Sequence, residues 1–470
     1  GYQRMNRPLP LVIDIDGTFL KTDMLFEGFW QALGKEPLAT VKAAATLFFD
    51  RPRLKARIAE IADVRADLLP VNPAVLELVE QAKAQGREVI FASAADRHVV
   101  GRLAELYGLT GEHLASDGRT NMKGGIKAKA LEARFGKGGF AYAGDAPADL
   151  PVWLSAAEAI VVGSHPAAVR KLNAAGIKVA ELPKTWSRRS MVKSLRPHQW
   201  VKNVLLLLPL IAAHRLDAQG LAAVLVATMA FCAAASSIYL VNDLLDLEAD
   251  RLHAKKRFRP VAAGDTKIPD AMLLSGALAV FALMAASLLG PGFLLATVLY
   301  MVLSTLYSLK LKKIRWLDIA TLASLFTLRV LAGALAAEVF ASLWLLAFVF
   351  PAFLALGGVK RLTELTLARS DGRIPGRGYT PADRRSLLNT VIAATAVSLA
   401  VFYGYTVSDS ARLLYHNLAV LRLAGIPFAI WQARMIYLGW HGEQDYDPLV
   451  FAMKDIKGIA LVLMTLGMIL

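Results

Sequence analysis

The stretch Ser237-Ile-Tyr-Leu-Val-Asn-Asp-Leu-Leu-Asp-Leu-Glu-Ala-Asp250 closes a long apolar run with a group of acids. Its polar residues Asn242, Asp243, Asp246 and Asp250 stand at relative positions 0, 1, 4 and 8. On a helix of about 3.6 residues per turn these side chains share one face. Three carboxylates on one face repel each other unless cations lie between them. The pattern predicts a magnesium–diphosphate site at a membrane edge, whereas a solvated helix end would not need the acids on one stripe.

The composition predicts an integral membrane protein with a soluble first third. The 470 residues are 56% hydrophobic and 19% charged, and most long apolar runs follow Val204. The net charge of +15 could indicate a nucleic-acid partner. Lys and Arg also concentrate in the cytoplasmic loops of membrane proteins, so we expect a lipid bilayer and no nucleic acid. The single cysteine, Cys232, excludes a disulfide framework, and the first residues lack the apolar core of a signal peptide.

Four short apolar segments in the soluble third resemble buried strands and are separated by helical patterns. They are Leu9–Thr18, Glu88–Ser93, Gly139–Asp145 and Ala159–Gly163. This order predicts an α/β fold with an open parallel sheet, whose ligands bind beyond the carboxyl ends of the strands. The polar residues of these segments fall at those ends.

These strand-end residues have the chemistry for phosphoryl transfer. Asp14 can attack phosphorus, and Asp16 can protonate the leaving oxygen and then activate water. Asp145 can complete a magnesium site with Asp14. Ser93 and a lysine can hold the phosphoryl oxygens. Both Lys127 and Lys123 fit the lysine role, and their spacing does not decide between them.

The soluble third resembles the haloacid dehalogenase (HAD) phosphatase superfamily. The matching residues are Asp14-x-Asp16-Gly17-Thr18, Ser93, Lys127 and Gly144-Asp145-x-x-x-Asp149. The resemblance implies Mg²⁺ held by Asp14, Asp16, Asp145 and Asp149, and a small helical cap over about residues 21–86. A degenerate HAD scaffold is the alternative, although every catalytic position is filled. We expect the phosphatase domain over residues 1–181 and a basic juxtamembrane linker over 182–194.

Residues 195–470 are expected to form an all-α membrane bundle of about nine helices. The apolar segments lie at 204–214, 220–241, 270–290, 292–309, 317–337, 341–358, 387–407, 414–438 and 456–470. If the N-terminus is cytoplasmic, most loop Lys and Arg residues lie in the cytoplasmic loops. This asymmetry predicts that the phosphatase domain and both active sites face the cytoplasm.

Polar residues near the membrane helices form further candidate sites. Arg196, Gln199 and Asn203 fall on one helical face, with Lys202 beside it. This face suits an anion, although cations snorkelling at a helix end are the alternative. Further along the chain, cations and polar residues precede or follow apolar segments: Lys256, Arg259, Tyr307, Lys312, Asp318, Arg329, Lys360 and Arg361. Asp318 and Arg329 are eleven residues apart on one predicted helix, and such intramembrane charges are functional candidates, with a buried ion pair as the alternative.

The membrane part of the chain, residues 195–470, resembles the UbiA-type intramembrane prenyltransferases. The matching motifs are Asn242-Asp243-x-x-Asp246-x-x-x-Asp250 and Tyr307-Ser308-x-x-Leu311-Lys312 leading to Asp318. In that family Mg²⁺ bridges the acids to a diphosphate. Arg196-Pro-x-Gln199-Trp200-x-Lys202-Asn203 and Lys360-Arg361-x-x-Glu364 look most like the decaprenyl-phosphate phosphoribosyltransferase branch, which serves cell-wall precursor synthesis. That branch transfers 5-phosphoribose from phosphoribosyl pyrophosphate (PRPP) to a polyprenyl phosphate.

The resemblance implies roles for the polar residues of the membrane part. Asp243, Asp246 and Asp250 would hold magnesium and diphosphate with support from Asn242, and Asp318 would orient the acceptor or the ribose. Cations would neutralise phosphates: Lys256, Arg259, Lys312, Arg196 and Lys202, with Arg329 or the Lys360–Arg361 pair near the lipid phosphate. A homo-oligomer is compatible with the sequence.

The fusion favours the phosphoribosyltransferase branch, because its product keeps a 5-phosphate that a tethered phosphatase can remove. An aromatic or quinone-pathway prenyltransferase, with a phosphatase of separate substrate, is the second hypothesis. A lipid-binding scaffold or a transporter whose acids move ions is the third, and the filled phosphatase site argues against it.

Overall fold

The computed structural model describes residues 7–117, 120–183, 187–368, 378–444 and 447–470, so part of the predicted linker, residues 184–186, lies outside the described residues. The chain divides into two compact units. Unit 1 comprises Gly1–Ser194 and Asp243–Leu273, and unit 2 comprises Leu195–Asn242 and Leu274–Leu470. The segment Asp243–Leu273, which the sequence predicts in the membrane domain, therefore packs with the soluble third.

Unit 1 is built on a six-stranded sheet in which all neighbouring strands are parallel, in the order β3-β2-β1-β4-β5-β6. The strands are β1 (Leu11–Ile13), β2 (Val89–Asp96), β3 (Leu114–Ser116), β4 (Ala141–Gly144), β5 (Glu158–Val162) and β6 (Lys178–Leu182). The predicted parallel sheet is confirmed. The sequence analysis missed β3, which has three residues, and β6, an edge strand with charged residues.

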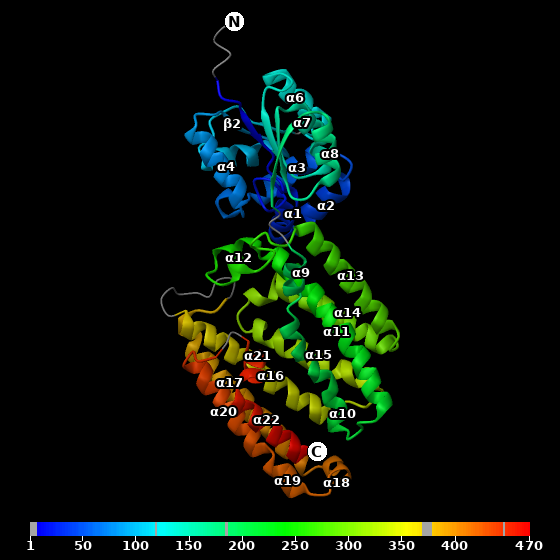
Figure 1. Ribbon diagram of the computed structural model, residues 1–470. Coiled ribbons are helices and arrows are strands. Elements are labelled where there is room, and N and C mark those ends of the chain that lie inside the picture. Colours follow the sequence, from blue (N-terminus) through cyan, green and yellow to red (C-terminus); the bar gives the residue numbers. More distant parts are fainter. Residues whose placement is uncertain (1–6, 118–119, 184–186, 369–377, 445–446) are drawn as a thin grey trace. The chain divides into compact units, whose positions relative to one another are not determined.

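Alternate residues of each central strand enter the cores on opposite faces of the sheet. Leu11 and Ile13 of β1 pack in the core that contains α4 (Pro73–Ala84) and α5 (Arg97–Leu106), whereas Val12 packs in the core on the other face. That second core contains residues of α6 (Gly125–Phe135), α7 (Leu150–Ser155) and α8 (Pro166–Ala174). Figure 1 shows these helices flanking the strands. Burial on both faces explains why the β1 sequence is continuously apolar.

The cap of unit 1 is smaller than the sequence predicts. Helices α1 (Met24–Lys35), α2 (Pro37–Thr46) and α3 (Arg51–Ala62) share a small core of their own that contains Leu54 and Ile58. Helix α4 instead packs Val75 and Val79 against the sheet. The predicted cap boundary near residue 86 is therefore too late, because α4 belongs to the layers that cover the sheet.

Most of the apolar part of the chain lies in unit 2. Two of the long apolar helices, Ala218–Leu245 and Ile268–Ser287, have one end in unit 1. Among the described residues, seven helices are long and apolar enough to cross a membrane: Ala218–Leu245 (α11), Ile268–Ser287 (α13), Pro291–Leu309 (α14), Leu317–Ala337 (α15), Leu343–Leu367 (α16), Pro381–Thr406 (with α17, Arg384–Thr406) and Leu418–Trp440 (α19, Leu418–Leu423, and α20, Gly425–Trp440). The shorter helices of unit 2 are α10 (Leu208–Ala212), α18 (Asp409–Leu414), α21 (Pro448–Lys454) and α22 (Ile456–Ile469), whereas α9 (Arg188–Ser194) and α12 (Leu247–Leu252) belong to unit 1.

The nine predicted spans are thus not confirmed. The first predicted span, 204–214, consists of the end of a 3₁₀ helix, η4 (Pro197–Leu207), followed by the five residues of α10. The last predicted span is α22, which has 14 residues.

Candidate functional site

Asp14 lies at the carboxyl end of β1, where the strand order reverses direction in the sheet. The chain runs from β1 to β2 and β3 on one side and then crosses to β4 on the other. Ligands of open α/β sheets bind at such a reversal. The Asp14 amide donates to the carbonyl oxygen of Ala143 in β4 at 3.0 Å. The next residues after β1 and β4 therefore meet at one place, as the sequence predicts.

Lys127 is the lysine that contacts Asp14. Its side chain is buried, and its Nζ donates to Asp14 Oδ1 at 3.2 Å and to the Tyr142 hydroxyl at 2.9 Å. The Lys123 side chain is exposed. The backbone amide of Ile15 also donates to Asp14 Oδ1, at 2.9 Å. Both bonds end on the same oxygen, so Oδ2 is the Asp14 atom suited to attack phosphorus.

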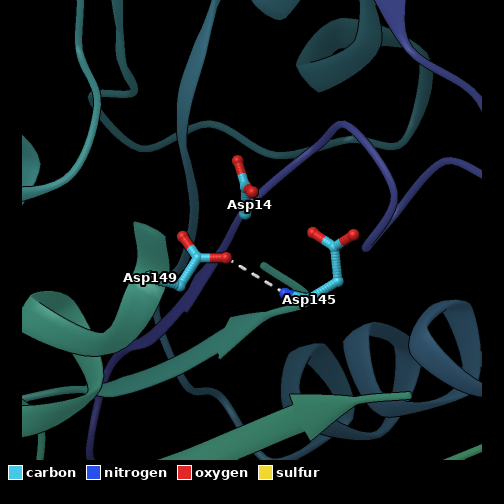
Figure 2. A group of neighbouring side chains, drawn as sticks. All are labelled: Asp14, Asp145 and Asp149. Atoms are coloured by element: carbon cyan, nitrogen blue, oxygen red, sulfur yellow. Dashed lines mark hydrogen bonds between the residues drawn. The ribbon is translucent and has the colours of Figure 1, made fainter. Parts of the chain in front are cut away.

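Asp145 and Asp149 complete a group of three acids with Asp14. One carboxylate oxygen of each lies within 4.8 Å of the others (Figure 2), and this is the group of three potential metal ligands found among the described residues. Asp149 Oδ2 accepts from the amides of Asp145 and Ala146 at 3.0 Å each, and Asp149 Oδ1 accepts from Tyr142 at 2.8 Å. Asp149 thus also fixes the loop that presents Asp145.

Gly17 gives Asp145 room to approach. Its φ is +76°, which L side chains rarely adopt, and an added Cβ would lie 2.2 Å from Asp145 Oδ2. The neighbouring Thr18 hydroxyl donates to Asp145 Oδ1 at 3.0 Å. In the Asp-x-Asp-Gly-Thr sequence, the glycine therefore leaves space for the Asp145 side chain and the threonine holds it by a hydrogen bond.

The three acids are arranged as a cation site. The pKa of Asp14 is raised to about 6, because burial, with a smaller contribution from the Asp149 carboxylate, outweighs the lowering effect of Lys127. Burial followed by repulsion from Asp14 and Asp149 raises the pKa of Asp145 to about 7. A divalent cation would relieve this repulsion. Mg²⁺ binds oxygens at about 2.0–2.1 Å, which requires them within about 4.2 Å of one another, so the residues present fit the ion after a small closure.

Asp16 and Ser93 lie near this group but have other contacts. Asp16 Oδ1 accepts from the Met24 amide at the start of α1, at 2.9 Å. Burial raises the pKa of Asp16 well above its ordinary value, and repulsion from Asp23 and then Asp14 adds to the effect. Asp16 is therefore suited to carry a proton to a leaving oxygen, and it is not in the group of three metal ligands. The buried Ser93 hydroxyl accepts from the Ala95 amide at 3.0 Å within β2, which continues past the predicted end to Asp96.

A cap residue that the sequence analysis missed reaches this site. Lys55 of α3 donates to the Ala94 carbonyl oxygen at 2.7 Å and to Asn121 Oδ1 at 2.9 Å. Burial lowers the pKa of Lys55, while the charges of Asp16 and Asp23 raise it. Lys55 and Asp16 line one cavity of about 1440 Å³. A lysine inside an amphipathic helix carries no motif, so only the packing of the cap reveals its place.

The acidic stretch after α11 is assembled differently from the prediction. Helix α11 ends at Leu245, Asp246 has the non-helical angles φ −101° and ψ 18°, and α12 begins at Leu247. The four residues thus do not lie on one continuous helix. Asp243 and Asp250 nevertheless both contact Arg259, whose NH1 lies 3.5 Å from Asp243 Oδ1 and 3.2 Å from Asp250 Oδ2.

Arg259 therefore lies between two of the acids that the sequence analysis assigns to magnesium. Burial raises the pKa of Asp250 to about 6; Arg259 opposes this, and the charges of Asp243 and Asp246 add to it. Lys256, whose side chain is exposed, also lowers this pKa. Because the helix breaks at Asp246, Arg259 contacts both Asp243 before the break and Asp250 after it.

In unit 2, Asp318 pairs with Arg361 rather than with Arg329. Arg361 of α16 donates through Nε and NH2 to the two carboxylate oxygens of Asp318, and through NH1 to Glu364 at 2.9 Å. The Tyr307 hydroxyl donates to Asp318 Oδ1 at 2.7 Å and accepts from Arg361 NH2 at 2.7 Å. Because two carboxylates and a tyrosine already satisfy Arg361, its predicted role at a lipid phosphate is less favourable than that of Arg329.

Arg329 forms a second polar cluster with residues of other helices. Its Nε donates to Asn203 Oδ1 at 3.1 Å, and its NH2 donates to the Tyr300 hydroxyl at 3.1 Å. Asn203 in turn donates to Cys232 Sγ at 3.3 Å. The guanidinium lies 4.9 Å from the centre of the Tyr300 ring. Arg329 is thus a cation held among neutral groups, which leaves its charge available to an anionic ligand.

The predicted face of Arg196, Gln199 and Asn203 changes because Gln199 and Asn203 lie on the 3₁₀ helix η4, whereas Arg196 precedes this helix with a φ of +49°. With about three residues per turn, Gln199 and Lys202 align instead. Lys202 forms an ion pair with Asp447 at 2.6 Å, and the Arg196 guanidinium lies 5.1 Å from the centre of the Tyr239 ring. Asn203 lies with Arg329 on a different side.

The two remaining predicted cations of unit 2 are both partly or fully buried. Lys312 donates to Asn242 Oδ1 at 3.3 Å, so the asparagine of the acidic motif is tied to the second motif. Lys360 is half-buried next to Arg361.

Comparison with known proteins identifies the family. Residues 204–367 match the model of the UbiA prenyltransferase family. An uncharacterized protein of Sinorhizobium fredii, y4nM, is 35% identical over 96% of this chain and 88% of its own length. The decaprenyl-phosphate phosphoribosyltransferase of Mycolicibacterium smegmatis is 38% identical over 46% of this chain and 69% of its own length. The chain belongs to the UbiA prenyltransferase family. A UbiA homologue from Archaeoglobus fulgidus, solved with GPP and Mg²⁺, is 15% identical with a TM-score of 0.46 and covers 60% of this chain and 99% of its own.

Membership of the UbiA family, together with the seven apolar helices, establishes an integral membrane protein. The family match contains the acidic stretch, Asp318, Arg329 and Arg361, and it ends before the loop that follows α16. The parallel sheet of unit 1 lies outside that match, in a part of the chain that the alignment with the Sinorhizobium relative covers.

Proposed function

We propose that this UbiA-family chain is a bifunctional membrane enzyme that makes a polyprenyl-phospho-ribose. Its membrane part would transfer 5-phosphoribose from PRPP to a polyprenyl phosphate and release diphosphate. Its HAD-like part would then remove the 5-phosphate from the ribose. The observation that carries the proposal is that Lys127 contacts Asp14, and Asp14, Asp145 and Asp149 lie together, on a chain of the UbiA family.

The relatives support the choice of donor and acceptor. The Mycolicibacterium protein, at 38% identity, is a decaprenyl-phosphate phosphoribosyltransferase. The product of such a transfer retains a phosphate monoester on C5 of the ribose. A phosphatase tethered to the same chain meets this product at a high effective concentration. A prenyltransferase that alkylates an aromatic ring would leave no phosphate for it.

In the proposed transfer, an oxygen of the lipid phosphate attacks the anomeric carbon of PRPP. The bond from that carbon to the diphosphate oxygen breaks, and its electron pair leaves with diphosphate. Asp318, held by Arg361 and Tyr307, is placed to orient the ribose or acceptor, and Arg329 supplies positive charge for the lipid phosphate. The acceptor phosphate is already anionic, so the transfer needs no strong base.

In the proposed dephosphorylation, Asp14 Oδ2 attacks phosphorus and the ribose O5 leaves with a proton from Asp16. Asp16 then takes a proton from water, which attacks the aspartyl-phosphate and releases inorganic phosphate. Lys127 and Lys55 neutralise phosphoryl oxygens. Lys127 already touches Asp14, and Lys55 approaches from the cap.

Magnesium is the cofactor proposed for both reactions. Asp14, Asp145 and Asp149 would hold one ion, and Asp243, Asp246 and Asp250 would hold ions with the diphosphate, where Mg²⁺ supplies charge neutralisation. In the second group Arg259 contacts two of the acids and would yield its place or join the diphosphate. We propose that both sites face the cytoplasm, because Lys and Arg concentrate in the loops on one side.

The test incubates purified full-length protein with Mg²⁺, PRPP and a polyprenyl phosphate and identifies the lipids by mass spectrometry. Wild type is expected to give the ribosyl lipid, Asp14→Asn the phosphoribosyl lipid, and Asp243→Asn neither. Asp409→Asn is the matched control because its carboxylate is highly exposed. Absence of any ribosylated lipid, with prenylation of a hydroxybenzoate by wild type, would sink the proposal in favour of the prenyltransferase.

A further inference from the structure

The outer surface of the cap exposes large apolar side chains. Phe49 is 97% and Leu38 is 89% exposed, the two highest values among large apolar residues of unit 1 that the structure describes. Val41 and Phe48 are also exposed, and the Phe48 and Phe49 rings meet edge to face at 5.1 Å. Leu38, Val41, Phe48 and Phe49 together form what we call the cap tip. Removing large apolar side chains from water is favourable, so water is an unfavourable surrounding for this tip.

The apolar residues of the cap tip follow the outer side of a helix. In α2, Leu38 and Val41 are exposed at a spacing of three, while Thr40 and Ala43 are buried. A surface helix of a soluble domain normally turns its polar residues outward. The outward apolar stripe is continued by Phe48 and Phe49 in the turn that follows α2. This arrangement is typical of segments that enter the interface of a bilayer.

Exposed basic residues outnumber exposed acids on the helices of the cap, although Arg53 lies 3.9 Å from Asp50 and Arg57 lies 3.4 Å from Glu60. The exposed basic residues on α1, α2 and α3 are Lys35, Lys42, Arg51, Arg53 and Arg57. The acids nearby are fewer: Glu36, Asp50 and Glu60. The Arg51 guanidinium lies 5.5 Å from the centre of the Phe48 ring, so charge and apolar surface are joined. Lys and Arg side chains near an anionic membrane surface are attracted to it.

Contacts within unit 1 hold the cap to a segment that emerges from the membrane. One candidate span ends at Leu245 and the next begins at Ile268. Between them, Arg251 forms a buried pair with Glu27 of α1 at 2.6 Å, and Glu248 accepts from Gln31 of α1 at 2.6 Å. Since α2 follows α1 after the single residue Glu36, the cap tip is tied to a membrane-proximal segment.

A third contact makes this attachment close. Lys21, just before α1, forms an ion pair with Asp265 at 2.8 Å. The adjacent Gly264 has a φ of +78°, and an added Cβ would lie 2.7 Å from the Lys21 Cβ. The backbone of the segment therefore approaches the cap base as closely as only a glycine allows.

We propose that the cap tip inserts into the headgroup region of the bilayer that contains the chain's own helices. The occupant of this apolar surface is lipid, with a preference for anionic headgroups. This would keep the phosphatase cavity, whose walls include Asp16 and Lys55 from the core and cap, at the level of a lipid-linked phosphate. That purpose rests on the proposed function, whereas the membrane contact itself does not.

The first test measures the contact without catalysis. Full-length protein carrying Cys232→Ser and Phe49→Cys is labelled with an environment-sensitive fluorophore and placed in nanodiscs of phosphatidylcholine and phosphatidylglycerol. Cys232 is the only native cysteine, so the label is unique. The matched control carries the label at Lys171→Cys, an exposed position on α8. We expect blue-shifted emission and quenching by spin-labelled acyl chains at position 49 and neither at position 171.

Two results of this test would overturn the proposal. A label at position 49 that behaves like the one at 171 shows that the tip stays in water. Crosslinking between two copies through Phe49→Cys, without quenching by lipid, shows that a second copy of the chain covers the tip.

The second test separates the contact from the proposed reaction. The double variant Leu38→Asp/Phe49→Asp should hydrolyse the soluble ester p-nitrophenyl phosphate as wild type does. It should process phosphoribosyl lipid in nanodiscs about tenfold more slowly, which corresponds to about 1.4 kcal/mol. If the double variant and wild type processed the lipid at equal rates, the proposed role of the cap tip in presenting the lipid-linked phosphate would be overturned. If lipid quenches the label on Phe49→Cys but wild type processes no such lipid, the proposed function fails while the membrane contact stands.

Discussion

Arg251 donates two hydrogen bonds to Glu27, a residue 224 positions earlier in the chain. NH1 lies 2.9 Å from Oε2 and NH2 lies 2.6 Å from Oε1, and the side chains are only 8% and 4% exposed. Arg251 also donates through Nε to the Ala262 carbonyl oxygen at 2.9 Å, and Glu27 accepts from the Thr22 hydroxyl at 2.6 Å. The pair joins the segment that carries Asp250 to the first cap helix.

Breaking this pair should strongly destabilise the attachment of the cap. Arg251→Met leaves the Glu27 carboxylate buried without its cation, which typically costs about 3–5 kcal/mol. We expect faster hydrogen exchange at the amides of α1 and a lower temperature of cap unfolding. Arg65→Met, which disrupts the exposed Arg65–Asp67 pair at 2.8 Å, should change neither.

The double variant Arg251→Met/Glu27→Leu should recover much of the protection, because no buried charge is then left unpaired. If Arg251→Met exchanged as slowly as wild type, the pair would have no part in holding the cap. If the double variant exchanged as fast as Arg251→Met, the lost protection would come from Arg251 contacts other than the one with Glu27.

The two acids after β4 should differ in how they affect magnesium. Asp145→Asn removes a proposed ligand and should weaken the apparent Mg²⁺ affinity of phosphatase activity the most. Asp149→Asn also changes a proposed ligand, but its two oxygens already accept from Tyr142 and the Asp145 amide, so we expect the smaller loss of affinity, about 10–100-fold, that is typical of supporting residues. Titrating Mg²⁺ against p-nitrophenyl phosphate hydrolysis measures both, and chelation should abolish the activity. Wild-type Mg²⁺ dependence in Asp145→Asn would contradict the site.

Lys55 should contribute to binding of the phosphate ester more than to its turnover. A hydrogen bond to a charged group is worth about 1.5–3 kcal/mol, so Lys55→Met should raise KM by roughly tenfold or more. Lys42→Met, an exposed lysine of the same cap, is the matched control. A fall in kcat with unchanged KM would show that Lys55 acts through the structure of the cap instead.

The Asp318–Arg361 pair should be required for transfer and dispensable for phosphatase activity. Asp318→Asn is expected to abolish transfer to the lipid while p-nitrophenyl phosphate hydrolysis remains. Arg361→Lys should also lose transfer, because a single ammonium cannot bond to Asp318, Glu364 and Tyr307 in the geometry of the guanidinium. Transfer at the wild-type rate in Arg361→Lys would exclude a geometric role for this pair.

The sequence predicts the parallel sheet and the meeting of Asp14 and Asp145, because parallel strands end at one edge and each of these two residues follows such a strand. Burial of Lys127 beside Asp14 distinguishes it from Lys123, which spacing alone cannot do. The cap lysine Lys55 has no such marker, since its role depends on how α3 packs over β2.

Contacts between helices were not predictable from spacing along one helix. Asp318 and Arg329 share a predicted face, yet each bonds to residues of other helices, Arg361 and Asn203. The break at Asp246 is also hidden, because the residues around it are compatible with a continuous helix. Likewise, no local pattern announces that Arg251 pairs with Glu27, which decides where the Asp243–Leu273 segment belongs.

The amounts of diphosphate and inorganic phosphate released from PRPP test the central claim most directly. Full-length protein with Mg²⁺, PRPP and a polyprenyl phosphate should release both in equal amounts, and each release should depend on the lipid. Asp14→Asn should release diphosphate alone, because transfer proceeds and the 5-phosphate stays on the lipid-linked ribose. Diphosphate without inorganic phosphate from wild type, or no lipid-dependent release of either, would contradict the account.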